Sequence, residues 1–140
     1  MERKTLSKVK KSLIIEQIQN ILRNKEYIIF AYLFGSFISE EAFNDIDIGI
    51  FTNNIGKETV LSVELELEGE LEEVLGIPVD IRVINYAPLP FRYNVLKERG
   101  ILIDRDPDLR SDFETMTYKE YFDYKHLRNE YLKGIIYGAV

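Results

Sequence analysis

Residues 44–51, which read NDIDIGIF, restrict the possible folds of this chain more than any other segment. Isoleucine alternates there with acidic or small residues: Ile46, Ile48 and Ile50 against Asp45, Asp47 and Gly49. Because successive side chains of a strand point to opposite faces, the isoleucines share one face and the aspartates share the other. The alternation predicts a strand with one face buried in a core and a functional surface on the opposite face.

Three further apolar runs predict strands. Residues 27–34 are apolar almost throughout and rich in β-branched and aromatic side chains, which favours a buried strand that Gly35 ends. Residues 78–84 predict a strand with Asp80, Arg82 and Ile84 on one face and only valine and isoleucine on the other. Residues 100–103 predict a short fourth strand.

Helices are predicted between and after these strands. Apolar residues three and four apart over 6–23 indicate an amphipathic helix capped by Thr5 or Ser7. Residues 57–75 match both helix and strand patterns, but their length favours a helix that ends at Gly76. Prolines open a short helix over 88–99, and Asp106-Pro107 begins a long final helix that extends to about Tyr137. The pattern indicates one α/β (α+β) domain over residues 1–140.

Composition excludes several classes of function. The chain has no cysteine and one histidine, so thiolate and multi-histidine metal sites are excluded, and a metal ion would need oxygen ligands. The net charge of −6 argues against direct nucleic-acid binding. No apolar run is long enough to span a membrane and no signal peptide precedes the first helix, so we expect no membrane association and a cytoplasmic location.

The acidic residues of the predicted strands suggest a reaction class. Asp45 and Asp47 would face the same side of their strand, close enough together for one divalent cation to lie between them. Asp80 would complete a metal site or accept the proton of an attacking hydroxyl. Carboxylate-bound Mg²⁺ or Mn²⁺ neutralises the charge that develops when a nucleotidyl group leaves a triphosphate, so the three acids are candidates for that chemistry.

Gly35-Ser36 supplies a candidate phosphate contact. Glycine lets the backbone approach a phosphate closely. If residues 36–41 form a helical turn rather than a simple turn, the first amide groups and the Ser36 hydroxyl would face the anion. We therefore expect Gly35 and Ser36 to bind the phosphates of the nucleotide.

These motifs together resemble a known family. LFGSF, NDIDIGI and PVDIRV are similar to motifs of the DNA polymerase β-like nucleotidyltransferases, and the small size resembles the minimal nucleotidyltransferase (MNT) branch. The resemblance covers residues 28–84, and FDYKHLRNEYL in the final helix also resembles that branch. It implies a mixed β-sheet flanked by helices, ATP as cosubstrate and Mg²⁺ as cofactor. It also implies a HEPN-domain ribonuclease toxin as partner, in a hetero-oligomer, with AMP transferred to a tyrosine of that toxin.

The resemblance also assigns roles to single residues. Gly35 and Ser36 would contact the β- and γ-phosphates, Asp45 and Asp47 would hold magnesium, and Asp80 would be a third ligand or the base. Where many members read Gly-Ser-x-Ala-Arg-Gly, this chain has Ile38-Ser39-Glu40 after Phe37, so the arginine is absent. Arg82 would replace that cation or form an ion pair with Asp80.

Three functions follow from these observations. The first is an antitoxin that adenylylates its partner toxin. The second, which the missing arginine motivates, is an antitoxin that binds its partner without catalysis. The third, a nucleotidyltransferase that modifies a small molecule such as an aminoglycoside, is disfavoured because no further domain remains to hold a sugar.

Other conspicuous residues have simpler interpretations. His126 is expected at a packed or exposed helical position, and the glutamates of 64–73 and the basic residues of 3–11 are expected on solvated helix faces. Tyrosines crowd the final helix, where they either pack or form a partner surface: Tyr118, Tyr121, Tyr124, Tyr131 and Tyr137.

Overall fold

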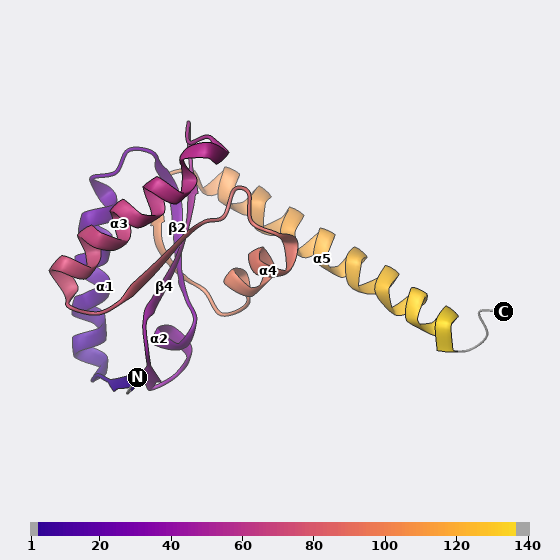
Figure 1. The fold of residues 1–140 in the computed structure, drawn as a ribbon, viewed down its shortest axis with the longest axis horizontal. Helices are drawn as coiled ribbons and strands as arrows, with labels where there is room; N and C mark the ends of the chain where they lie inside the picture. Colours follow the sequence, from indigo (N-terminus) through magenta and orange to yellow (C-terminus); the bar gives the residue numbers. More distant parts are fainter. Residues whose placement is uncertain (1–2, 137–140) are drawn as a thin grey trace.

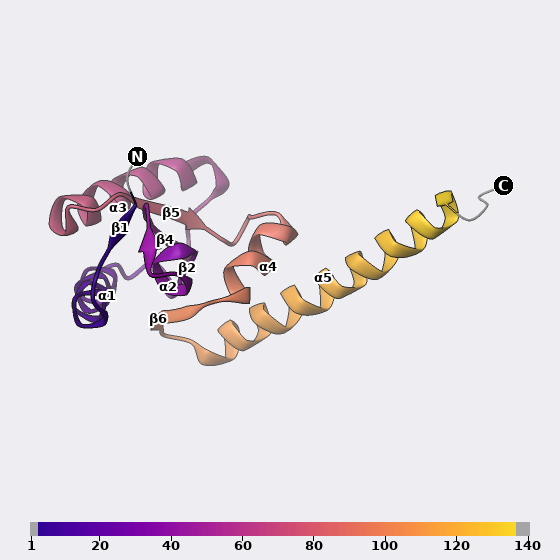
Figure 2. The ribbon, with the colours of Figure 1, turned by 90° about the horizontal axis from the view of Figure 1, so that it is seen from below.

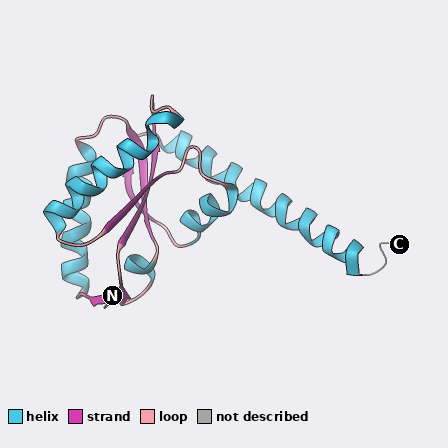
Figure 3. Ribbon diagram, in the orientation of Figure 1, coloured by secondary structure: helices cyan, strands magenta, loops and turns pink. Residues whose placement is uncertain are grey.

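The computed structural model describes residues 3–136 (Figure 1). Helices and strands alternate along most of the chain (Figure 3). In order, they are β1 (Lys4–Thr5), α1 (Lys8–Arg23), β2 (Ile28–Phe34), α2 (Ser36–Ser39), β3 (Ala42–Phe43), β4 (Ile46–Thr52), a 3₁₀ turn (Lys57–Thr59), α3 (Val60–Leu75), β5 (Val79–Val83), α4 (Leu89–Lys97), β6 (Gly100–Asp104) and α5 (Pro107–Ile136). The predicted helices and main strands are confirmed; the pair β1–β3 was not predicted.

Four of the strands form a mixed sheet in the order β5-β4-β2-β6. Strand β4 runs parallel to β5, whereas β2 runs antiparallel to both β4 and β6. The parallel pair requires a crossover, and α3 provides it. This arrangement confirms the predicted mixed sheet with flanking helices.

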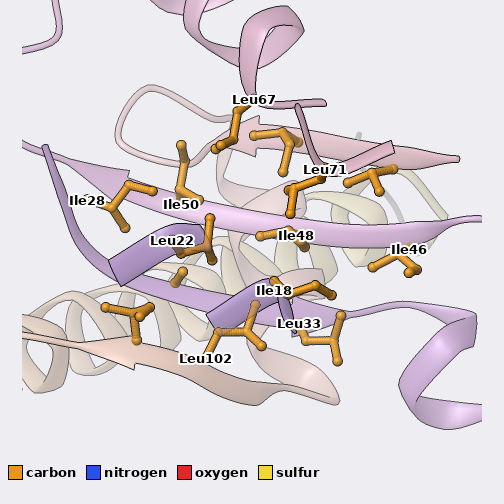
Figure 4. Packing of buried hydrophobic residues seen from close by; sticks show 14 of the residues in the cluster. Ile18, Leu22, Ile28, Leu33, Ile46, Ile48, Ile50, Leu67, Leu71 and Leu102 are labelled. Carbon is orange, nitrogen blue, oxygen red and sulfur yellow. The ribbon is translucent and has the colours of Figure 1, made fainter. Parts of the chain in front are cut away.

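Each face of the sheet is covered by a pair of helices (Figure 2). The isoleucines of β4 lie in the larger core, where Ile18 and Leu22 of α1 and Leu67 and Leu71 of α3 pack against them (Figure 4). Helices α4 and α5 cover the opposite face, with a second core formed by Phe30, Tyr32, Ile84, Val95 and Leu96. The predicted alternation of β4 therefore holds, but its second face is also largely packed, and polar side chains occupy only its first residues.

The ends of three helices follow from local chemistry. Ser7 caps α1 by accepting a hydrogen bond from the Lys10 amide, which decides between the two predicted caps. Gly76 ends α3 in the left-handed conformation, with φ of 68°, as expected for a glycine stop. Asp106 accepts a bond from the Leu109 amide at 3.0 Å and so caps α5.

Helix α3 covers the open edge of β5 with carboxylates. The predicted solvated glutamate face is confirmed for Glu66 and Glu73, which are exposed, but three other glutamates bind β5. Glu64, Glu68 and Glu72 each accept a hydrogen bond from a backbone amide of β5, at 2.9, 2.8 and 2.9 Å. Their spacing of four places them on one side of the helix. An unpaired strand edge exposes amide donors that need acceptors, and these side chains supply them.

Helix α5 is anchored to the sheet at its start and projects from the body at its end (Figures 1 and 2). Near its start, Glu114 accepts a hydrogen bond from the buried Tyr32 hydroxyl at 2.7 Å and from Arg110 at 3.0 Å. Further along, the ring of Tyr121 stacks on Tyr93 of α4, with centroids 3.7 Å apart. The predicted tyrosine cluster therefore divides into packed and exposed members.

The projecting half of α5 leaves large apolar side chains in solvent: Phe122, Tyr124, Leu127, Tyr131, Leu132 and Ile135. Leu127 and Tyr131 are 67% and 69% exposed, and His126 is exposed among them. Tyr137 lies outside the described residues. No helix within residues 3–136 is long and apolar enough to cross a membrane.

Candidate active site

Asp47 occupies the centre of the candidate site. It lies near the start of β4, where it pairs with Phe34 of β2 on one side and with Asp80 of β5 on the other. The register therefore brings two of the predicted acids together, because the neighbouring strands run in the same direction from this end of the sheet. Asp45 lies one residue before β4, so the predicted strand over 44–51 starts too early.

The environment of Asp47 opposes its ionisation. The pKa of Asp47 is raised from 3.8 to about 6, mainly by burial and also by the nearby charges of Asp45 and Asp80, while Arg82 partly opposes the rise. Desolvation and neighbouring like charges both favour the neutral carboxyl group. A divalent cation bound here would instead favour the ionised carboxylate, because it replaces the repulsion between like charges with attraction.

Arg82 forms an ion pair within the site. Its Nε donates to Oδ1 of Asp80 at 3.2 Å, and the two side chains are 55% and 38% exposed. Of the two roles that the sequence left open for Arg82, the structure contains the ion pair. Because both groups are exposed to solvent, we expect this pair to contribute little to stability.

Gly35 separates β2 from α2 and lies against Asp47. Its φ of 79° is in a region that favours glycine. A Cβ atom at this position would lie 2.2 Å from Oδ2 of Asp47, so the carboxylate occupies the space that any other residue would need. Ser36 begins the four-residue helix α2, which confirms a single helical turn, and its first amides have no partner within the helix.

The segment after Ser36 is held by basic residues from the start of the chain. Lys11 Nζ donates to the carbonyl oxygens of Phe37 and Glu40 at 2.7 and 2.9 Å. Arg3 pairs with the Glu40 carboxylate at 2.7 Å. The prediction that these basic residues lie on a solvated helix face is therefore wrong for Lys11, which is half-buried, whereas Arg3 is exposed but precedes the helix. Sequence gave no signal for the contact, because the partners are mostly backbone carbonyls far along the chain.

The carboxylates of Asp45, Asp47 and Asp80 are suitable ligands for a hard divalent cation, although they are not already arranged around a common point. Within residues 3–136 no three acidic or histidine side chains are already arranged as a metal cluster. Asp45 and Asp80 are nevertheless close enough to Asp47 for their charges to raise its pKa. Carboxylate oxygens are the ligands that Mg²⁺ and Mn²⁺ prefer, and these are the groups that would hold such an ion.

The fold is shared with solved structures of toxin–antitoxin complexes. The MNT antitoxin of Shewanella oneidensis, solved with a tri-AMPylated HEPN toxin, matches with a TM-score of 0.69 and 21% identity over 90% of this chain and 98% of that chain. A chain of the MntA-HepT toxin–antitoxin structure matches with a TM-score of 0.68 and 20% identity, over 89% and 98%. A toxin–antitoxin structure with AMP-PNP gives 0.69 and 20%, over 87% and 98%. At these identities the similarity shows that the fold is shared.

Sequence comparison identifies the family to which the chain belongs. The "Putative protein adenylyltransferase MJ1217" of Methanocaldococcus jannaschii is 32% identical over 100 residues, which are 71% of this chain and 99% of that protein. The family model described as "Polymerase beta, Nucleotidyltransferase" matches residues 16–108, a range that contains the three aspartates and Gly35-Ser36. The chain belongs to this polymerase β nucleotidyltransferase family, as the sequence motifs indicated.

Proposed function

We propose that this nucleotidyltransferase transfers AMP from ATP to a hydroxyl group, that of a tyrosine, on a HEPN-type toxin, and so acts as its antitoxin. The observation that carries the proposal is the position of Asp47, which lies against Gly35, pairs with Asp80 in the sheet and has its pKa raised by Asp45 and Asp80. In this proposal the phosphate site at Gly35 and the cation site at the aspartates adjoin each other. The relative named as a protein adenylyltransferase and the antitoxin structures support the choice of acceptor.

The reaction proposed for this site is an in-line displacement. The acceptor oxygen bonds to the α-phosphorus, the bond from that phosphorus to the bridging oxygen breaks, and pyrophosphate leaves. We assign the Asp80 carboxylate, which is partly exposed beside Asp47, as acceptor of the hydroxyl proton. Asp45 and Asp47 would hold Mg²⁺, and that ion would neutralise the negative charge on the phosphate oxygens.

Gly35 and Ser36 have a positioning role in this proposal. The positive φ of Gly35 turns the chain where its backbone lies against the Asp47 carboxylate. A triphosphate bound by the acids would then meet the free amides and hydroxyl at the start of α2. Residues 1–140 would act as one minimal domain, and the absence of cysteine fits a reducing compartment such as the cytoplasm.

The projecting half of α5 is the surface we propose for the toxin. Its exposed apolar residues are contiguous along the helix, and such patches mark protein interfaces. Leu127→Asp and Tyr131→Asp are expected to abolish co-purification with the toxin. Asp112→Asn, which lies on the exposed side of α5 before its projecting half, serves as the control and should leave the complex intact.

Catalysis is tested with ATP labelled on the α-phosphate. The purified protein, Mg²⁺ and the candidate toxin from the neighbouring reading frame are expected to give labelled toxin, whereas γ-labelled ATP gives none. Absence of α-label on the toxin would contradict the proposal. If Asp45→Ala/Asp47→Ala still protects cells from the toxin, the alternative of a non-catalytic antitoxin is favoured instead. Transfer of AMP to a small alcohol, but to no protein, would favour the third function.

A further inference from the structure

A cavity beside Gly35 lies outside the acidic cluster. Its volume is about 300 Å³, and it is lined by Phe34, Gly35, Asn94, Lys97 and Glu98. It therefore lies between the end of β2 and the last turn of α4. Gly35 forms part of its wall, and the same glycine is in van der Waals reach of the Asp47 carboxylate. If the α-phosphate of a nucleotide lies at the aspartates, its β- and γ-phosphates need only pass Gly35 to reach this cavity.

The segment that forms the acidic site has no cation of its own. Residues 26–56 contain neither lysine nor arginine, although they include Gly35, Ser36, Asp45 and Asp47. A triphosphate carries several negative charges, and one cation between two carboxylates cannot neutralise all of them. Further positive charge must therefore come from another part of the chain.

Most basic side chains near this end of the sheet already have partners. Arg82 is paired with Asp80, Arg92 with Glu120, and Arg99 with Glu114. Lys11 donates to two backbone carbonyls. Lys97, in contrast, makes no hydrogen bond or ion pair with any residue of the described range 3–136, and its side chain is exposed.

We propose that Lys97 binds the terminal phosphates of the nucleotide in this cavity, with the Asn94 amide as a second donor. The inference rests on the proposed function, because it assumes that the α-phosphate lies beside the three aspartates, where a cation that they hold would bind it. A lysine ammonium suits the role, since it is a compact charge on a flexible stem that can follow the phosphates. Lys97 is thus a binding residue that the sequence motifs do not include.

Glu98 provides an internal check of this assignment. Its carboxylate lines the same cavity as Lys97 but carries the opposite charge. A phosphate group in the cavity must be attracted by one side chain and repelled by the other. Neutralising each in turn is therefore expected to change triphosphate affinity in opposite directions.

The test measures equilibrium binding of AMP-PNP and of AMP, both with Mg²⁺, by calorimetry on the full-length protein. Lys97→Gln is expected to weaken AMP-PNP binding roughly tenfold, the usual effect of one charge-assisted hydrogen bond. AMP binding should remain unchanged, because AMP lacks the terminal phosphates. Lys97→Arg should restore most of the affinity, and Glu98→Gln should strengthen AMP-PNP binding. Lys119→Gln, an exposed lysine of α5, is the matched control and should have no effect.

Several results would overturn the inference. Equal affinity of Lys97→Gln and the unchanged protein for AMP-PNP would do so, as would an equal loss for AMP and AMP-PNP. Circular dichroism establishes that the variants fold, which is expected because Lys97 is exposed. If the unchanged protein binds neither nucleotide, the proposed function itself fails. If it binds both nucleotides but Lys97→Gln does not weaken AMP-PNP binding, only the assignment of Lys97 fails.

Discussion

Two groups of three carboxylates lie near β5 and differ in what surrounds them. Glu64, Glu68 and Glu72 each accept a hydrogen bond from a β5 amide. Burial and the charges of Asp80, Glu72 and Glu64 raise the pKa of Glu68, and the bond from the Ile81 amide opposes that rise. In the aspartate group, Asp80 has an arginine partner, whereas the charge of Asp47 lies among other carboxylates. Acidity alone therefore does not identify a site. Acids that cap a strand edge stabilise the fold, whereas acids that crowd one another destabilise it and can be retained for binding a cation.

The comparison is tested most strongly by Asp47→Asn. The exchange removes a charge from the crowded group and keeps the size of the side chain. We expect AMP transfer to fall by roughly a thousandfold or more, because the variant loses a group that positions the reacting phosphate. The rate of α-label transfer to the toxin measures the effect. Glu73→Gln, at an exposed position of α3, serves as the control, and an active Asp47→Asn enzyme would contradict the assignment of the site.

Gly35→Ala sharpens the distinction by moving the Asp47 carboxylate without changing its charge. The new Cβ would meet Oδ2 of Asp47 at 2.2 Å, and the backbone would be strained at φ of 79°. We expect a loss of transfer activity of roughly a hundredfold, since misplaced groups lose their catalytic alignment. Gly69→Ala is the matched control, because a Cβ there contacts nothing within 4 Å and a helix favours alanine. Equal activities of the two variants would refute the role of Gly35.

Glu68→Ala tests the group of glutamates that accept hydrogen bonds from β5. It leaves the amide of Ile81 without its acceptor at the sheet edge, so the free energy of unfolding should fall by about 1–2 kcal/mol. AMP transfer at a temperature where the variant remains folded should persist. Chemical denaturation measures the first quantity, and the label assay measures the second. Glu66→Ala, on the exposed side of α3, is the control; a loss of activity without a loss of stability at Glu68 would place that residue in the site.

The pH dependence of the free energy of unfolding also tests the aspartate group, and the expected effect is smaller. In the absence of metal, the folded pKa of Asp47 is raised to about 6 from 3.8. The folded protein therefore holds this proton more tightly than the unfolded chain, so the stabilising contribution is present at low pH and is lost as the pH rises towards about 6. Above that value Asp47 destabilises the metal-free protein, by on the order of 1–2 kcal/mol once its partial exposure is considered.

Asp47→Asn isolates this contribution. In chelator at pH 7, the variant should be more stable than the unchanged protein, and the difference should shrink as the pH is lowered to about 5. Denaturant unfolding at both pH values measures the difference. A variant that is less stable at pH 7 would show that the Asp47 charge is satisfied in the fold, which would remove the contrast with the glutamates.

Local sequence patterns were sufficient to predict the helices and main strands and to propose which acids form the site. Alternation of Ile46, Ile48 and Ile50 with Asp47 places the isoleucines in a core and the carboxylate on the opposite face, because the period of a strand is two. The length and the glutamate and leucine content of 57–75 favoured a helix over a strand. Gly76 and Asp106 gave two helix boundaries. All of these signals are local, so they can be read without knowledge of the neighbours in space.

Which groups lie together in space depends on how the helices and strands pack. The register of β4 with β5 places Asp47 beside Asp80, and the turn at Gly35 brings a backbone from β2 against the same carboxylate. The attachment of Glu64, Glu68 and Glu72 to the β5 edge, and the opening of the Lys97 cavity towards Gly35, likewise join residues that are distant in sequence. No periodicity within one segment encodes such contacts, because they depend on how the segments pack against one another.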